Sequence, residues 1–464
     1  MIVIAVAMIA IVIALFDYSL KVMTTHFYKN PHILSIPVTD KYVLIVNPLQ
    51  QNAVRLLNTF QYELLKAMDD VEAAQYITDN HNNKHIQKFL DIIQQENFAN
   101  TSNIFETKLA QPKSLSLWVH TTDACNLRCK YCYIHTKESN MQMQEDVTLA
   151  LCNKIILTVC DEKLQKVILR MSGGEPFLNY KLWDKYFQYL KEKLSEYECV
   201  LNIVFLTNFT LINDDVIAFI QKHSINISGS IDGIGIFNDQ TRIMKNGNGT
   251  FGVIEKNIKK LRKAGITPFL MTVVSNNNLD GLVEFTKYVI KENLSMRYSI
   301  VQHDSFDYEK ALPIFQECYQ IFDQAIENGY AFSNKHKLGD LHFTKFSDRT
   351  CSCGRNAGTI YVNGDIFFCQ QQVGSELKLG SVFDEQNLIS TIVTGDNYNG
   401  NLSKECLSCQ YQYICSGGCP LSRVNGKSES CNFYQKIIPI VYRLIGLERL
   451  KQINDFETYN RLNK

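Results

Sequence analysis

Cysteines are the residues of this sequence best suited to chemistry. The 464 residues include 15 of them, and three lie close together in Cys125-Asn-Leu-Arg-Cys129-Lys-Tyr-Cys132. Three thiolates at this spacing can hold three irons of a cubane cluster and leave the fourth iron without a protein ligand. An open iron is what a chelating cofactor needs if electron transfer is to activate it. The same residues could instead hold zinc, with His135 as a fourth ligand.

A second set of cysteines lies in the C-terminal part of the chain. Its members are Cys351, Cys353, Cys369, Cys406, Cys409, Cys415, Cys419 and Cys431. Two fully ligated cubanes would use eight thiolates, although the CxxC spacing is also typical of zinc ribbons. Disulfides are not expected, because tight cysteine groups in a chain of this size are typical of metal ligation in a reducing compartment. The other four, Cys152, Cys160, Cys199 and Cys318, match no motif and are expected to be inert core residues.

The elements that must position these residues form an alternating pattern. Strand-like runs are predicted at residues 115–120, 166–171, 201–207, 225–231, 266–274 and 295–302. Helices are predicted between them at residues 182–194, 214–223, 253–264 and 279–292. This alternation predicts an α/β fold with a parallel sheet of right-handed βαβ units, either open or curled into a barrel. Cys125 then follows the first strand, at the end of the sheet where such folds place active sites.

With an aromatic residue, Tyr131, before its last cysteine, the CxxxCxxC motif resembles that of the radical S-adenosylmethionine (SAM) superfamily. The resemblance implies a partial (β/α)6 TIM-like barrel over residues 111–302. It also implies that Cys125, Cys129 and Cys132 hold a catalytic [4Fe–4S] cluster whose open iron binds SAM. Reductive cleavage of SAM would give methionine and a 5′-deoxyadenosyl radical, which abstracts a hydrogen atom from the substrate.

Further positions match this family. The segment Met171-Ser-Gly-Gly-Glu-Pro176 resembles its GGEP motif, in which glycines allow close backbone approach and the glutamate accepts from the SAM amino group. Ser230 and Arg242 resemble the pair that contacts the SAM ribose and carboxylate. The cofactor-binding residues implied in this way are Tyr131, Gly173, Gly174, Glu175, Asn208, Ser230 and Arg242.

The C-terminal cysteine spacing resembles the seven-cysteine SPASM pattern, over residues 350–440. This resemblance implies two auxiliary [4Fe–4S] clusters, and therefore three clusters in all. The outer cluster would be held by Cys406, Cys409, Cys415 and Cys431. The inner cluster would be held by Cys353, Cys369 and Cys419, with Cys351 able to supply a fourth thiolate.

The N-terminal region has two parts. Residues 1–20 open with an apolar run that ends at Phe16, which is shorter than the ~20 residues of a membrane span. It predicts a weak membrane anchor, a helix packed on the protein or an unused upstream start. Residues 30–105 predict two hairpin strands and two helices, at 53–68 and 86–95, followed by a polar linker at 96–114. They resemble the winged-helix-like peptide-recognition element of peptide maturases, where a leader peptide adds a strand to a sheet edge; a structural cap on the barrel is the alternative.

Residues 303–349 predict a helical bridge, and residues 441–464 predict a helical tail. The 47 basic and 47 acidic residues form no long run of one sign, so no nucleic-acid partner is expected. We expect a cytoplasmic radical SAM/SPASM maturase of ribosomally made (RiPP) peptides, reduced by flavodoxin or ferredoxin. Membrane association through residues 1–16 stays open.

Sulfatase-maturating members of the family place an aspartate base directly after the cysteine that corresponds to Cys369. Here Gln370 follows, and a neutral amide cannot act as a proton acceptor at neutral pH. The sequence therefore favours another peptide modification, such as a thioether or a C–C cross-link. The alternatives are a sulfatase-maturase-like or small-molecule-modifying SPASM enzyme, and a non-catalytic zinc-binding interaction protein.

Overall fold

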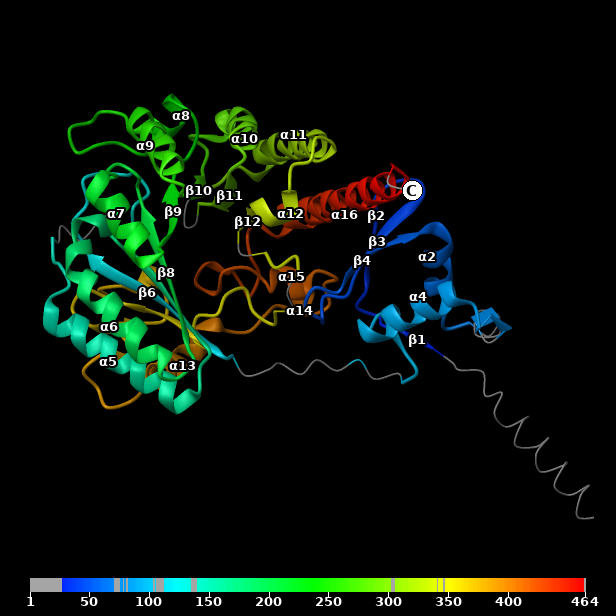
Figure 1. Ribbon diagram of the computed structural model, residues 1–464, viewed down its shortest axis with the longest axis horizontal. Coiled ribbons are helices and arrows are strands. Elements are labelled where there is room, and N and C mark those ends of the chain that lie inside the picture. The colour runs from blue at the N-terminus through cyan, green and yellow to red at the C-terminus, as the bar shows by residue number, and fades with distance from the viewer. Residues whose placement is uncertain are drawn as a thin grey trace, which may run out of the picture. The chain divides into compact units, whose positions relative to one another are not determined.

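The structure, a computed structural model, describes residues 27–70, 76–77, 79–80, 82–102, 105, 112–134, 140–301, 305–339, 341–344 and 347–462. The chain divides into two compact units (Figure 1). The smaller comprises Met1–Lys108 and Phe343–Phe346, and the larger comprises Leu109–His342 and Ser347–Lys464. The apolar run at residues 1–16 lies outside the described residues. In the part of the chain that is described, no helix has the length and apolar character to cross a membrane.

The smaller unit is built on an antiparallel sheet of β2 (Leu34–Pro37), β3 (Tyr42–Val46) and β4 (Val54–Asn58). The predicted hairpin is confirmed, but the helix predicted over 53–68 is wrong in its first part. The helix α2 (Thr59–Lys66) begins only after Asn58, whose side chain caps it by accepting from the backbone N–H of Gln61. The apolar residues before Asn58 pair with β3 instead.

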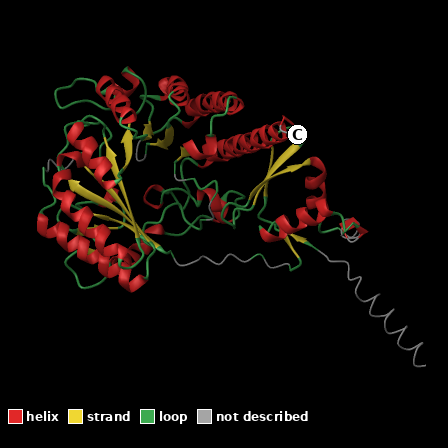
Figure 2. Cartoon of the chain, viewed as in Figure 1, coloured by secondary structure: helices red, strands yellow, loops and turns green. Residues whose placement is uncertain are grey.

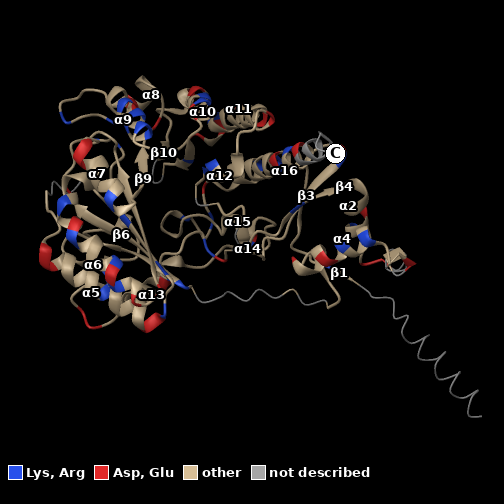
Figure 3. Ribbon diagram, in the orientation of Figure 1, with Lys and Arg blue, Asp and Glu red and all other residues tan. Residues whose placement is uncertain are grey.

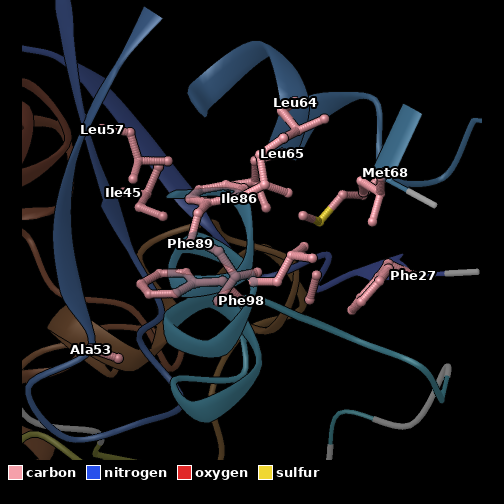
Figure 4. Packing of buried hydrophobic residues seen from close by; sticks show 14 residues of the cluster. Phe27, Ile45, Ala53, Leu57, Leu64, Leu65, Met68, Ile86, Phe89 and Phe98 are labelled. Atoms are coloured by element: carbon pink, nitrogen blue, oxygen red, sulfur yellow. The ribbon is translucent and has the colours of Figure 1, made fainter. Parts of the chain in front are cut away.

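The core of the smaller unit lies between the sheet, α2 and α4 (Lys84–Gln95) (Figure 4). The helix α4 confirms the helix predicted over 86–95. Phe98 lies in this core with Phe27 and Phe89 and has no exposed surface. It precedes β5 (Ala99–Asn100), which pairs with β1 (Tyr28–Lys29). The start of the predicted polar linker is therefore part of the packed unit, because a buried aromatic side chain anchors it.

The larger unit holds a ten-stranded sheet (Figure 2). Its six predicted strands are confirmed and run parallel in chain order: β6 (Ser114–Thr122), β7 (Lys166–Gly173), β8 (Val200–Thr207), β9 (Asn226–Ser230), β10 (Phe269–Val274) and β11 (Ser295–Ile300). Two further parallel strands, for which no residue range was predicted, join the sheet: β12 (His336–Leu338) beside β11 and β13 (Ala357–Ile360) beside β6. The antiparallel strands β14 (Asp365–Phe367) and β15 (Gly380–Ser381) complete the sheet.

Helices cover one face of this sheet, and the four predicted ones are confirmed to within a few residues. The helices of this layer are α5 (Glu145–Glu162), α6 (Trp183–Ser195), α7 (Asp214–His223), α8 (Ile236–Asp239), α9 (Phe251–Lys263) and α10 (Leu282–Lys291). Single-turn 3-10 helices lie at Pro176–Leu178, Tyr180–Leu182 and Leu279–Gly281. Charges of both signs are interspersed along the layer (Figure 3), as in the ion pair of Lys222 with Asp184 at 2.8 Å.

The two faces of the parallel strands differ in burial. Phe205 of β8 is fully buried, and its ring packs against Phe187 of α6 and Phe219 of α7 at 6.3 and 5.8 Å. Residues on the opposite face, such as Arg170 of β7 and Val204 of β8, are only half-buried. The face turned away from the helices is therefore open to solvent rather than packed as a core.

The bridge after β11 contains α11 (Tyr308–Glu327) and α12 (Phe332–Lys335), but β12 interrupts the predicted helical stretch. The long C-terminal helix α16 (Cys431–Leu462) begins at the last cysteine, before the predicted tail. Three short helices lie in the sequence between the bridge and α16: α13 (Leu388–Val393), α14 (Lys404–Leu407) and α15 (Gln412–Cys415). The same segment has 3-10 turns at Gln370–Gln372, Thr394–Asn399 and Pro420–Ser422.

Candidate active site

The loop that carries Cys125, Cys129 and Cys132 follows β6 directly. The pKa of the Cys125 thiol is raised to about 12, mainly by burial and also by the nearby charges of Glu175, Cys129 and Cys132. Burial also raises the pKa of Cys129. Thiols in such a setting ionise when they bind a metal centre, because the positive charge of the centre replaces the lost hydration.

The donor set fits an iron–sulfur cluster with an open iron. All ligands of a zinc site coordinate the same ion, whereas each thiolate of a cubane binds a different iron. Among the described residues, no three His, Cys, Asp or Glu side chains converge on a single-ion site. The alternative zinc ligand, His135, lies outside the described residues.

Two glycines let the end of β7 pass against the cysteine loop. The backbone N–H of Gly174 donates to the carbonyl of Thr122 at 2.6 Å. A Cβ atom on Gly174 would lie 2.1 Å from the carbonyl oxygen of Ala124, and one on Gly173 would lie 2.2 Å from that of Thr122. Gly173 also has a φ of 121°, which side-chain-bearing residues rarely adopt. Only glycine fits at these two positions.

The carboxylate of Glu175 joins the ends of β7 and β8. It has no exposed surface and accepts from the hydroxyl of Thr207 at 2.8 Å, the backbone N–H of Asn208 at 2.7 Å and that of Phe177 at 3.2 Å. Burial raises the pKa of Glu175 to about 7 in spite of these bonds. Its role as acceptor for the SAM amino group stays a prediction.

Asn208 connects the end of β8 to the first cysteine. Its Nδ2 donates to Oδ1 of Asn126 at 2.9 Å and lies 3.7 Å from Sγ of Cys125. The side chain of Asn126 in turn donates to the hydroxyl of Thr210 at 2.7 Å. Asn126 and Thr210 were not predicted as site residues, because their spacing in the sequence gives no sign of this contact.

Tyr131 and Arg242 meet at Asp232, a residue that the sequence-based prediction missed. The Tyr131 hydroxyl donates to Oδ2 of Asp232 at 2.6 Å, and Nη1 of Arg242 donates to the Tyr131 oxygen at 2.5 Å. Asp232 is fully buried and also accepts from the hydroxyl of Thr241 at 2.9 Å. Its position in the Ser-Ile-Asp-Gly segment after β9 was the available signal.

Ser230 and Arg242 were predicted as a pair. Ser230 ends β9 and is half-buried, and within the described chain it makes no hydrogen bond to Arg242. Arg242 is buried, and its Nε has no hydrogen-bond partner among the described residues. An unpartnered buried donor beside the cysteine loop fits a cofactor that brings an acceptor, such as a carboxylate.

The C-terminal cysteines fall into two groups. Hydrogen bonds between Cys353 and the thiols of Cys351 and Cys369 raise the pKa of Cys353. Burial raises the pKa of Cys419 most, and Cys369 and Cys351 lie close enough for their charges to raise it as well. The second group lines one pocket, and its members are Cys406, Cys409, Cys415 and Cys431. This is the division that the SPASM resemblance implies, and cluster binding by the two groups stays a prediction.

Comparison with known proteins finds a family match over the segment that carries the first site. The model of the radical SAM superfamily matches residues 119–289, which contain the end of β6, the cysteine loop and β7 to β10. This chain is a radical SAM enzyme. Membership implies that the enzyme uses SAM and a [4Fe–4S] cluster.

The enzyme is related to sulfatase-maturating enzymes. It is 24% identical over 340 residues to the serine-type anaerobic sulfatase-maturating enzyme of Bacteroides thetaiotaomicron, over 64% of this chain and 80% of the relative. It is 28% identical over 278 residues to an uncharacterized protein of Methanocaldococcus jannaschii, over 59% of this chain and 90% of that protein. The solved structure of native anSMEcpe with bound AdoMet and Cp18Cys peptide matches with a TM-score of 0.58 at 20% identity, over 72% of this chain and 99% of that one, and shows the shared fold.

Proposed function

We propose that this radical SAM enzyme modifies a ribosomally made peptide, and that two auxiliary clusters assist the reaction. The observation that carries the proposal is the presence of three separate cysteine groups in the larger unit, one of three residues and two of four. Four thiolates can complete a cubane, whereas three leave an iron open. The first group would therefore bind SAM, and the other two would exchange electrons.

Cys125, Cys129 and Cys132 would hold the cluster, and SAM bound to it would supply the radical chemistry that removes a hydrogen atom from the substrate. The chain's own residues position the cofactor and exclude water. Asn208 and Tyr131 fix the cysteine loop to the ends of β8 and β9 through buried hydrogen bonds. Arg242 offers its free Nε to the cofactor carboxylate. Because Glu175 and Asp232 are fully buried, these contacts form in a region of low dielectric constant, where they are strong.

A pocket on the open face of the sheet supports a peptide substrate through the groups that line it. The pocket begins at Arg297 and Ser299 of β11 and reaches Cys415 and Cys419 of the two auxiliary groups. Its lining is rich in hydroxyl groups, including those of Thr350, which suits the hydrogen-bonding groups of a peptide backbone. A substrate there would lie within reach of the auxiliary groups.

The smaller unit would bind the leader of the substrate. Its sheet has two outer strands, β2 and β4, and an added peptide strand needs backbone N–H groups along the edge. Pro37 removes one donor from β2, whereas β4 contains no proline. We therefore assign leader binding to the β4 edge. Deleting residues 1–105 should abolish peptide binding, while SAM cleavage without peptide should continue. A deletion variant that still binds the peptide would contradict leader recognition by this unit.

Modification of a sulfatase is the second candidate, and the relation to sulfatase-maturating enzymes favours it. Against it, Gln370 and Gln372 occupy the turn after Cys369, where a carboxylate base would be needed. The two candidates differ in substrate. An assay with a sulfatase-derived peptide and with a peptide encoded beside this protein would separate them by mass change.

Iron content tests the clusters directly. After anaerobic purification and reconstitution, we expect about twelve irons per chain, and about eight when Cys125, Cys129 and Cys132 are all changed to Ala. The triple variant should form no 5′-deoxyadenosine. Cys160→Ala is the matched control and should keep both properties, because Cys160 lies outside the motifs. Its side chain is exposed, so the prediction that it is a core residue was wrong. About four irons in the parent chain would contradict the auxiliary clusters, and zinc without SAM cleavage would contradict the function itself.

A further inference from the structure

The loop that joins the two auxiliary cysteine groups has an unusual backbone. Cys415 belongs to one group and Cys419 to the other, and the three residues between them, Ser416, Gly417 and Gly418, have φ values of 49°, 74° and 79°. A Cβ atom on Gly417 would lie 2.4 Å from the side chain of Leu402. Successive residues in this conformation cannot form regular secondary structure, so other groups must satisfy their carbonyl oxygens.

Arg423 satisfies all three. Its Nη2 donates to the carbonyls of Ser416 at 2.7 Å and Gly418 at 3.0 Å, and its Nε lies 3.2 Å from those of Gly417 and Gly418. Its Nη1 donates to the carbonyl of Asn399 at 2.7 Å. The hydroxyl of Thr350, the residue before Cys351, contacts the same loop at the carbonyl of Gly418 at 2.6 Å.

The charge of Arg423 has no carboxylate partner among the described residues. Burial lowers its pKa, and the groups that act in the opposite direction are all cysteines, led by Cys419 and Cys406. A half-buried cation without a counter-ion is costly, because neutral carbonyls replace only part of its hydration. Two cubanes, each held by four thiolates, would carry the negative charge that compensates it.

We propose that Arg423 is a positioning residue that serves as the shared counter-charge of both auxiliary clusters and raises their reduction potentials. A cluster gains one negative charge when it accepts an electron, and a nearby fixed cation stabilises that reduced form. The guanidinium also holds the spacing of Cys415 and Cys419 through the loop carbonyls. The inference rests on the auxiliary clusters of the proposed function but not on its peptide substrate.

The test is a potentiometric titration of the full chain with dithionite, followed by electron paramagnetic resonance. Using the variant that lacks Cys125, Cys129 and Cys132 leaves only the auxiliary signals. Arg423→Gln should keep about eight irons and shift the midpoint potentials to more negative values. Arg355→Gln is the matched control, because Arg355 lies beside Cys353 in the sequence but is already paired with Asp348 at 3.2 Å. It should shift the potentials much less.

Unchanged potentials in Arg423→Gln, or a shift no larger than that in Arg355→Gln, would overturn the proposal. If Arg423→Gln loses iron, the iron content and midpoint potentials of Arg423→Lys test the proposal instead. A lysine that restores iron and potential supports a counter-charge. A lysine that restores iron but leaves the potentials lowered, or that restores neither, overturns it. Because no peptide is added, failure of peptide modification would leave this result unaffected.

Discussion

Asp232 connects the cysteine loop to the strand ends at the scale of single residues. Its carboxylate binds Tyr131 and Thr241, and Nη1 of Arg242 lies 3.9 Å away. We expect Asp232→Asn to lower the free energy of unfolding by about 3 kcal/mol, because it leaves a buried guanidinium without a charge partner. SAM cleavage, measured as 5′-deoxyadenosine, should fall about 100-fold as the loop shifts. Asp307→Asn, at the cap of α11, makes the same chemical change and should leave both properties near parent values; equal cleavage by the two variants would contradict this role.

Gly174 gives a second prediction at this scale. Gly174→Ala would place a methyl group 2.1 Å from the carbonyl oxygen of Ala124, so the cysteine loop must move. Reconstituted iron should fall from about twelve to about eight, as in the triple cysteine variant. Gly252→Ala, in α9 where a Cβ atom meets nothing within 4 Å, should retain parent iron and gain stability from the better helix former. Parent iron content in Gly174→Ala would show that the loop tolerates the shift.

The cysteines and the glycine pair could be predicted from the sequence because their spacing is local. Asp232 and Asn126 could not, because their partners lie far away along the chain. Asp232 is 101 residues from Tyr131, and Asn126 is 84 residues from Thr210. Such contacts depend on strand order, which no local pattern contains.

His336 illustrates the scale of elements, where β11, β12, α11 and α12 meet. Its ring stacks on Phe332 at 4.8 Å, and burial lowers its pKa from the ordinary 6.5 to about 3. Between these values the unfolded chain binds a proton that the folded chain does not, so stability falls as the pH drops. From pH 7.5 to pH 5 this group should cost about 2 kcal/mol. His336→Phe should lose that part of the acid sensitivity in thermal unfolding at the two pH values.

His85→Asn, at an exposed histidine of α4, is the control and should keep the acid sensitivity of the parent. If His336→Phe did the same, the buried imidazole would not be its source. At this scale the long apolar strands and helices were predictable from their periodicity. The strand β4 was not, because the spacing of Val54, Leu56 and Leu57 fits a helix as well as a strand. The strands β12 and β13 are too short to show a pattern.

The division into two compact units is the main feature of the whole molecule. Phe98→Ala removes a fully buried ring from the core of the smaller unit and should cost that unit about 3–5 kcal/mol. Peptide binding should weaken, whereas SAM cleavage without peptide should persist because the cysteine groups lie in the larger unit. Binding by fluorescence anisotropy and 5′-deoxyadenosine formation measure the two effects. Phe383→Ala, at a ring that is 58% exposed, should change neither; loss of SAM cleavage in Phe98→Ala would contradict independent units.

The half-buried face of the parallel strands has a consequence for how the family diversifies. Side chains on the helix-facing side, such as Phe205, determine whether the chain folds, because their neighbours surround them completely. Side chains on the other side, such as Val204 and Arg170, have room around them and contribute less to folding. Substitutions on that surface therefore change the free energy of unfolding only slightly. The same scaffold is free to acquire new substrates by drift on one side of its strands while selection preserves the other.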